Sequence, residues 1–125
     1  MNHTLEVFAE DTLIFASDRN WLYPLLDFEV YLTSTGTDPG FLTVHDKVVG
    51  RAAALFLVHL GITSIRAGIL SKLGEDALQH YQVQYSYRTL VDRIDCKTEE
   101  LLQETKEHSA AYTLIKNRAG LSTPD

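Results

Sequence analysis

The residues best suited to chemistry form the stretch His45-Asp46-Lys47, which stands directly before the most apolar part of the chain. A carboxylate beside an ammonium group can act as an acid–base pair or hold a polar ligand. At a helix start, free backbone N–H groups add an affinity for anions. Two interpretations follow: Asp46 caps a helix while Lys47 points to solvent, or both residues line a ligand pocket.

Further residues join this candidate ligand-binding site. Gly50, near the start of the expected apolar helix, indicates close approach of the backbone to a strand or a ligand. Ser71 follows an expected strand, where it either caps the next helix or faces the same crevice. Cys96 beside Lys97 is either a thiol of lowered pKa or a simple inert cysteine.

The same residue types argue against a zinc site. A zinc-dependent deaminase needs a His or Cys ligand followed two positions later by Glu, and two further thiolates from a Cys-x-x-Cys pair. This chain has one cysteine, and Lys47 stands two positions after His45. Its five histidines show no metal-ligand spacing. We therefore expect no metal and no cofactor.

Composition limits the class of protein. With 125 residues the chain is expected to form one domain over residues 1–125. A net charge of −6 argues against general nucleic-acid binding, although a small anion could still bind in a local positive pocket. The single cysteine favours a reducing compartment. Residues 1–11 lack the apolar core of a signal peptide, and the apolar run over residues 52–58 is too short to span a membrane. We expect a cytoplasmic protein with no membrane partner.

Hydrophobic patterning indicates a mixed sheet of about five strands that starts with an N-terminal hairpin. Strands are expected over 4–9, 12–17, 41–44, 61–70 and 83–87, and helices over 17–32, 48–60, 71–81, 88–94, 98–108 and 109–120. Alternating helices and strands favour helices on both faces of the sheet, which is a three-layer α/β/α sandwich. The segment from Val48 to Leu60 is apolar nearly all round, so the sheet must cover one side and other helices or a second subunit the other.

The run from Asp46 to Ala54 (Asp-Lys-Val-Val-Gly-Arg-Ala-Ala-Ala), Ser71 at a strand end, and the later positions Leu90, Val91 and Ile94 together carry a family resemblance. Over residues 4–96 the chain resembles a small prokaryotic family of unknown function with a cytidine deaminase-like fold. The resemblance implies the same α/β/α sandwich. The sequence departs from that family at residues 95–104, where Asp-Cys-Lys replaces an Asn-Arg pair and no Cys-Pro follows.

Three classes of function remain open. The first is a deaminase-like domain without the zinc site that binds a small nucleotide-like or anionic ligand at the helix start. The second is a zinc-independent enzyme that uses Asp46 and Lys47. The third is an interaction module that forms a homodimer through its apolar helix. A ligand screen by thermal shift separates the first two from the third, because a specific ligand stabilises the folded state.

Overall fold

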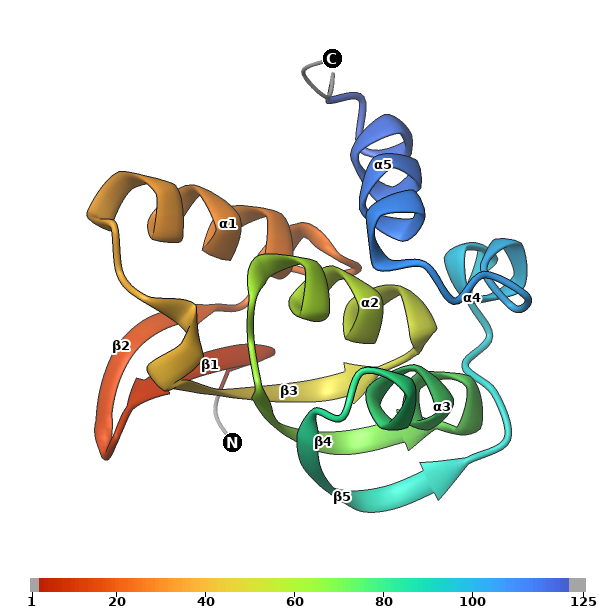
Figure 1. Ribbon diagram of the computed structural model, residues 1–125, viewed down its shortest axis with the longest axis horizontal. Helices are drawn as coiled ribbons and strands as arrows, with labels where there is room; N and C mark the ends of the chain where they lie inside the picture. Colours follow the sequence, from red (N-terminus) through yellow and green to blue (C-terminus); the bar gives the residue numbers. More distant parts are fainter. Residues whose placement is uncertain (1–2, 122–125) are drawn as a thin grey trace.

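A five-stranded mixed sheet organises the chain (Figure 1). The computed structural model describes residues 3–121. The strand order is β2-β1-β3-β4-β5, where β1 runs antiparallel to both neighbours and β3, β4 and β5 run parallel to one another. The mixed sheet and its N-terminal hairpin are therefore as predicted. The strands are β1 (Leu5–Ala9), β2 (Thr12–Ser17), β3 (Leu42–Val49), β4 (Ser64–Ser71) and β5 (Gln84–Val91).

The helices pack on one face of this sheet in two successive layers. They are α1 (Tyr23–Thr35), α2 (Arg51–Leu60), α3 (Lys72–His80), α4 (Lys97–Leu101) and α5 (His108–Arg118), with a short 3-10 turn at Pro39–Phe41. Helix α2 contacts α1 and α3 beside it and α5 behind it. Within residues 3–121 the opposite face of the sheet carries no helix, so the predicted sandwich with helices on both faces is not the arrangement found.

Helix α2 is buried on all sides, as its composition predicts. Every residue from Arg51 to Leu57 is buried, and the ring of Phe56 stacks on that of Tyr112 with 5.4 Å between the centroids. The back of α2 is covered by α5 of the same chain, so this helix needs no second subunit to bury it.

The start of α2 lies later than its sequence predicts. Val48 and Val49 belong to β3, where they pair with Ile69 and Leu70 of β4. Gly50 then adopts an extended conformation as the residue before the helix. Valine fits either a buried helix or a strand, and here the neighbouring strand decides in favour of the sheet.

Two expectations for the later chain are also wrong. The sequence predicts a helix over residues 88–94, but β5 continues to Val91 because Thr89, Leu90 and Val91 pair with β4. The helix expected over 98–108 ends at Leu101, and a loop joins it to α5. The buried Arg51 holds this loop by donating to the backbone carbonyls of Gln103 and Thr105.

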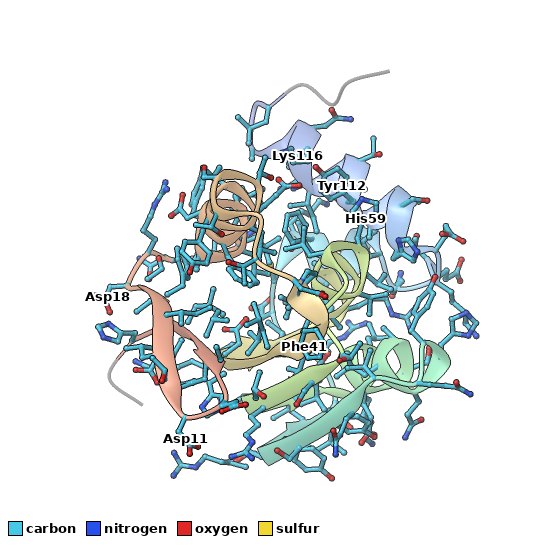
Figure 2. The ribbon with its side chains drawn as sticks, turned by 60° about the vertical axis from the view of Figure 1, so that its left-hand side comes forward. Asp11, Asp18, Phe41, His59, Tyr112 and Lys116 are labelled. Carbon is cyan, nitrogen blue, oxygen red and sulfur yellow. The ribbon has the colours of Figure 1, made fainter. Side chains whose placement is uncertain are left out.

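Polar side chains fix α5 against α1 and α2 (Figure 2). Lys116 pairs with Glu29 at 2.7 Å, and the Tyr112 hydroxyl donates to the same carboxylate. The ring of His59 stacks on Tyr112 and its Nδ1 lies 2.9 Å from Nδ1 of His108. Burial, followed by the neighbouring His108, lowers the pKa of His59.

Across the described residues, no helix combines the length and apolar character needed to cross a bilayer.

Candidate functional site

A buried carboxylate occupies the start of α2. The Glu99 side chain, only 3% exposed, comes from α4. Its Oε1 accepts hydrogen bonds from the Arg51 backbone N–H at 2.7 Å and from the Ser71 hydroxyl at 2.8 Å, and its Oε2 accepts from the Ile94 N–H. A negative charge is favourable here because the N-terminus of a helix carries a partial positive charge. The protein therefore supplies an anion of its own at the position where the sequence suggested an external one.

Ser71 links the starts of two helices. Its hydroxyl oxygen accepts a hydrogen bond from the Gly74 N–H at 2.9 Å, so Ser71 caps α3 as predicted. The same hydroxyl donates a hydrogen bond to the Glu99 carboxylate. Gly74 lies so close to Gly50 that a Cβ atom on it would be 3.0 Å from the Gly50 carbonyl carbon. Helices α2 and α3 therefore begin close to each other, and the Glu99 carboxylate bonds to residues at both starts.

Gly50 has the close contact that its position in the sequence indicates. A Cβ atom added to Gly50 would lie 2.7 Å from Oε1 of Glu99. Such a distance is far inside van der Waals contact, so a side chain at position 50 would displace the carboxylate. The contact partner is a side chain of the protein itself.

A pocket of about 230 Å³ opens beside this carboxylate, and we call it the helix-start pocket. It is lined by Trp21, Leu22, Val48, Gly50, Ala52, Ala53, Ile94, Cys96, Thr98 and Glu99. Its walls are mainly apolar, which is typical of small-molecule sites. Trp21, in the segment before α1, is 38% exposed. The sequence pattern singled out Gly50 and Cys96 but missed Trp21 and Glu99.

Two residues that line this pocket have backbone N–H groups without an acceptor in the described part of the chain. In α2, Arg51 donates its N–H to Glu99, and the Ala54 N–H reaches the Gly50 carbonyl at 3.0 Å. Between them, the N–H groups of Ala52 and Ala53 have no acceptor among the residues that the structure describes. Free donors in the first turn of a helix point out along its axis, toward the helix start.

Cys96 and Lys97 do not act together. The Cys96 side chain is half-buried at the pocket, with Sγ 2.9 Å from the Thr98 hydroxyl oxygen. Lys97 is exposed and its ammonium nitrogen lies 3.9 Å from the Glu100 carboxylate. The structure therefore brings Gly50, Ser71 and Cys96 together around Glu99, and leaves Lys97 outside.

Asp46 and Lys47 lie in strand β3, so the interpretation of Asp46 as a helix cap is wrong. Consecutive strand residues point to opposite faces. Asp46 pairs with Leu5 and Ala67, both buried, on the face that carries the helices. Lys47 lines a groove on the other face. The two side chains cannot form the acid–base pair that the sequence suggested.

The position of Asp46 changes its chemistry. Burial raises the pKa of its carboxyl group to about 7, although hydrogen bonds from the Val48 and Lys47 backbone N–H groups act in the opposite direction. Asp46 thus loses its proton near neutral pH.

No cluster of three His, Cys, Asp or Glu side chains suited to a metal ion occurs within residues 3–121.

Comparison with known proteins identifies the family. Residues 3–119 match the sequence profile described as a domain of unknown function, DUF1893. A solved structure of a DUF1893 family protein from Thermotoga maritima is similar to this chain, with a TM-score of 0.82 and 23% sequence identity. The match covers 92% of this chain and 80% of that one. No curated protein matches the sequence.

Proposed function

The chain belongs to the DUF1893 family, and we propose that it binds a small molecule in the helix-start pocket. The observation that carries this proposal is the pair of unused N–H groups of Ala52 and Ala53 at an apolar pocket. A ligand that accepts both hydrogen bonds would satisfy donors that the protein leaves free, and each such bond contributes on the order of 0.5–1.5 kcal/mol.

The pocket favours a neutral acceptor over an anion. Glu99 already places a negative charge at the start of α2, and it would repel a phosphate or carboxylate group of the ligand. A carbonyl oxygen or a ring nitrogen can accept from the two N–H groups without that repulsion. Trp21 offers an aromatic surface beside them. The ligand class is therefore a flat, uncharged heterocycle of the size of a nucleobase.

We also propose that the chain has a cytidine deaminase-like fold. It is supported by the Asp46–Ala54 motif, by Ser71 at a strand end and by the mixed five-stranded sheet. A zinc-dependent reaction is not part of the proposal, because one cysteine cannot supply the thiolates that such a site needs. A reaction by Asp46 and Lys47 as a pair is not proposed either, since they lie on opposite faces of the sheet. A homodimer remains an untested prediction, and α2 provides no free surface for it.

The chain carries two reporters of this pocket, because Trp21 and Cys96 are its only tryptophan and its only cysteine. A library of nucleobases and related heterocycles would be screened by thermal shift. A compound in the pocket should raise Tm, change the Trp21 fluorescence, and slow the alkylation of Cys96 by iodoacetamide as measured by intact mass.

A variant with a filled pocket provides the matched control. Ala52→Leu adds volume to the wall of the pocket and should abolish both the fluorescence change and the protection of Cys96. Cys96→Ser keeps the shape of the pocket and should keep the fluorescence change. Compounds that raise Tm equally in wild type and Ala52→Leu, without protecting Cys96, would refute binding at this pocket.

A further inference from the structure

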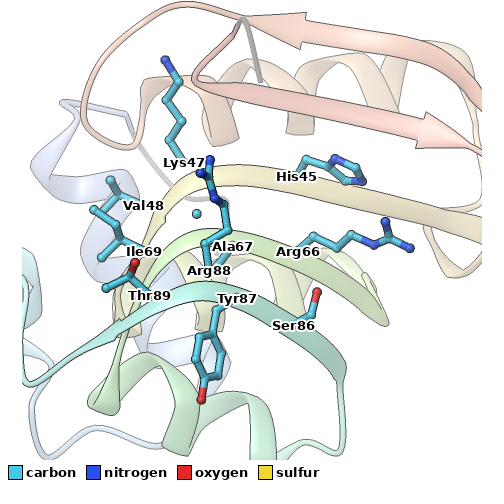
Figure 3. Close-up of a pocket in the computed structure, with 11 residues that line it drawn as sticks. His45, Lys47, Val48, Arg66, Ala67, Ile69, Ser86, Tyr87, Arg88 and Thr89 are labelled. Carbon is cyan, nitrogen blue, oxygen red and sulfur yellow. The ribbon is translucent and has the colours of Figure 1, made fainter.

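The helix-free face of the sheet carries a groove of about 660 Å³ that is rich in cations (Figure 3). We call it the basic groove, and its lining includes the cations Lys47, Arg66 and Arg88 and the imidazole of His45. They come from β3, β4 and β5. No Asp or Glu residue lines this groove. In a chain with a net charge of −6, such a local excess of positive charge is unexpected.

Strand register arranges the groove in rows. His45, Arg66 and Ser86 stand opposite one another across the three parallel strands, as do Val48, Ile69 and Thr89 further along. Between these two rows lie Lys47 on β3, Gly68 on β4 and Arg88 on β5. The groove thus has one cation, Arg66, in the row at His45, and two cations, Lys47 and Arg88, in the next row. Alternate residues of a strand are about 6.6 Å apart, which is the spacing of these two rows.

Gly68 leaves an open floor between two cations. A Cβ atom at this position would lie 2.6 Å from the Lys47 carbonyl oxygen, so no other residue fits here without a shift of the backbone. The backbones of β3 and β5 are about 10 Å apart, on either side of β4. Figure 3 shows the Arg88 side chain extending from β5 toward β3, on the side of the groove where Lys47 lies. This floor is wide enough for a phosphoryl group between an ammonium and a guanidinium group.

Three cations of the groove form no ion pair with the residues that the structure describes. Within residues 3–121, five other Lys and Arg side chains form ion pairs, namely Arg19, Arg51, Lys72, Lys97 and Lys116, while exposed cations elsewhere, such as Arg118, do not. Among residues 3–121, Lys47, Arg66 and Arg88 form none, and all three are exposed. Neighbouring cations repel one another unless an anion joins them. Burial first, and then the Arg66 charge, lowers the pKa of His45.

Acidic and apolar neighbours limit the size of the occupant. Glu10 and Asp11 line the adjoining hollow, which also contacts Arg66. Glu6 stands opposite His45 on β1. A long polyanion would have to pass these carboxylates, whereas a small anion would not. At the other end, Val48 and Ile69 are 44% and 39% exposed, and they offer an apolar surface to the uncharged part of a ligand.

We propose that the basic groove binds a small organic molecule that carries two or more phosphoryl groups, with one group over Gly68 between Lys47 and Arg88 and another near Arg66. Charge-assisted hydrogen bonds to phosphoryl oxygens are strong, and arginine can donate two at once. The apolar row at Val48 and Ile69 takes the part of the ligand that bears no phosphate. This site adjoins the helix-start pocket at Val48, which lines both, but its cations do not line that pocket and it does not depend on the function proposed there.

Isothermal titration calorimetry with inorganic tripolyphosphate and with adenosine triphosphate tests the proposal. Both probes should bind at low ionic strength, and adenosine triphosphate should bind more tightly because it also covers the apolar row. Lys47→Met and Arg88→Met each remove a cation and keep an unbranched side chain, and each should raise Kd about 5- to 20-fold. Circular dichroism melting curves would verify that both variants remain folded.

Arg118→Met is the matched control, because Arg118 is an exposed cation on α5 without an ion pair in the described part of the chain. This variant should change Kd by less than twofold. Equal weakening by Arg118→Met and Lys47→Met would refute the groove in favour of general charge attraction. The absence of binding to both probes at millimolar concentration, or binding to single-stranded oligonucleotides alone, would overturn the proposal as well.

Discussion

The two faces of the sheet treat charge in opposite ways. On the helix side, Glu99 and Arg51 are buried, and partners within the chain satisfy both. On the helix-free side, Lys47, Arg66 and Arg88 are exposed and unpaired among the described residues. A buried charge must find its partner when the chain folds, because no water reaches it. An exposed charge remains hydrated without a partner in the protein, and it is therefore available to bind a ligand. Changes on the helix side should therefore affect stability, whereas changes in the basic groove should affect binding.

The largest loss of stability is expected from Phe56→Ala. Phe56 is fully buried in α2, so its removal leaves a cavity between the sheet and α5. We expect the free energy of unfolding to fall by about 3–5 kcal/mol, measured by urea denaturation. Phe41→Ala is the control, because Phe41 is 80% exposed and its loss should cost less than about 0.5 kcal/mol. Equal effects of the two changes would contradict the buried position of α2.

Glu99→Ala should have the next largest effect. It leaves the Arg51 N–H, the Ser71 hydroxyl and the Ile94 N–H without their acceptor. The expected loss is about 2–4 kcal/mol in the free energy of unfolding. The neighbouring Glu100→Ala changes an exposed residue and should cost less than about 0.5 kcal/mol. If Glu99→Ala were as stable as Glu100→Ala, Glu99 would not be the internal anion of the α2 start.

Asp46→Asn should change how stability depends on pH. The pKa of Asp46 is raised to about 7 in the folded protein, so the folded state binds more protons than the unfolded state between about pH 4 and pH 7. Wild-type stability should therefore decrease across this range as the pH rises. Asp46→Asn removes this contribution, and its stability relative to wild type should increase with pH.

The gain of Asp46→Asn over wild type should reach on the order of 1–2 kcal/mol at pH 8, which is less than the full pKa shift implies, because Asp46 as a whole residue is only half-buried. Denaturation curves at pH 5, 6, 7 and 8 measure this change. Asp11→Asn, at an exposed residue of the hairpin turn, is the matched substitution with which these curves are compared. Parallel pH profiles for wild type and Asp46→Asn would mean that Asp46 is ionised as readily as an exposed aspartate.

The smallest effect on stability is expected in the basic groove. Arg66→Met removes one of several unpaired cations, so the free energy of unfolding should change by less than about 0.5 kcal/mol, with a slight gain at low ionic strength. Unfolding in urea at low and at high salt measures both quantities. A loss above about 1 kcal/mol would show that Arg66 has a partner in the fold, and the contrast between the two faces would then not hold.

Local patterns in the chain were sufficient for much of the framework. Two β-rich segments with a two-residue link at Glu10 and Asp11 predict the hairpin, and Ser71 predicts the start of α3, because strand preference and helix capping depend on residues close in the sequence. The apolar composition of α2 predicts its burial. The single cysteine limits zinc chemistry whatever the fold.

Only the tertiary structure decided which of these residues meet. Val48 and Val49 suit a helix or a strand, and pairing with β4 places them in β3. That pairing also sends Asp46 and Lys47 to opposite faces of the sheet. Glu99 lies far from Arg51 in the sequence, and no local signal links the two. The two candidate sites both depend on contacts between distant segments, and such contacts follow from packing and strand register, which residue types and spacing along the chain do not encode locally.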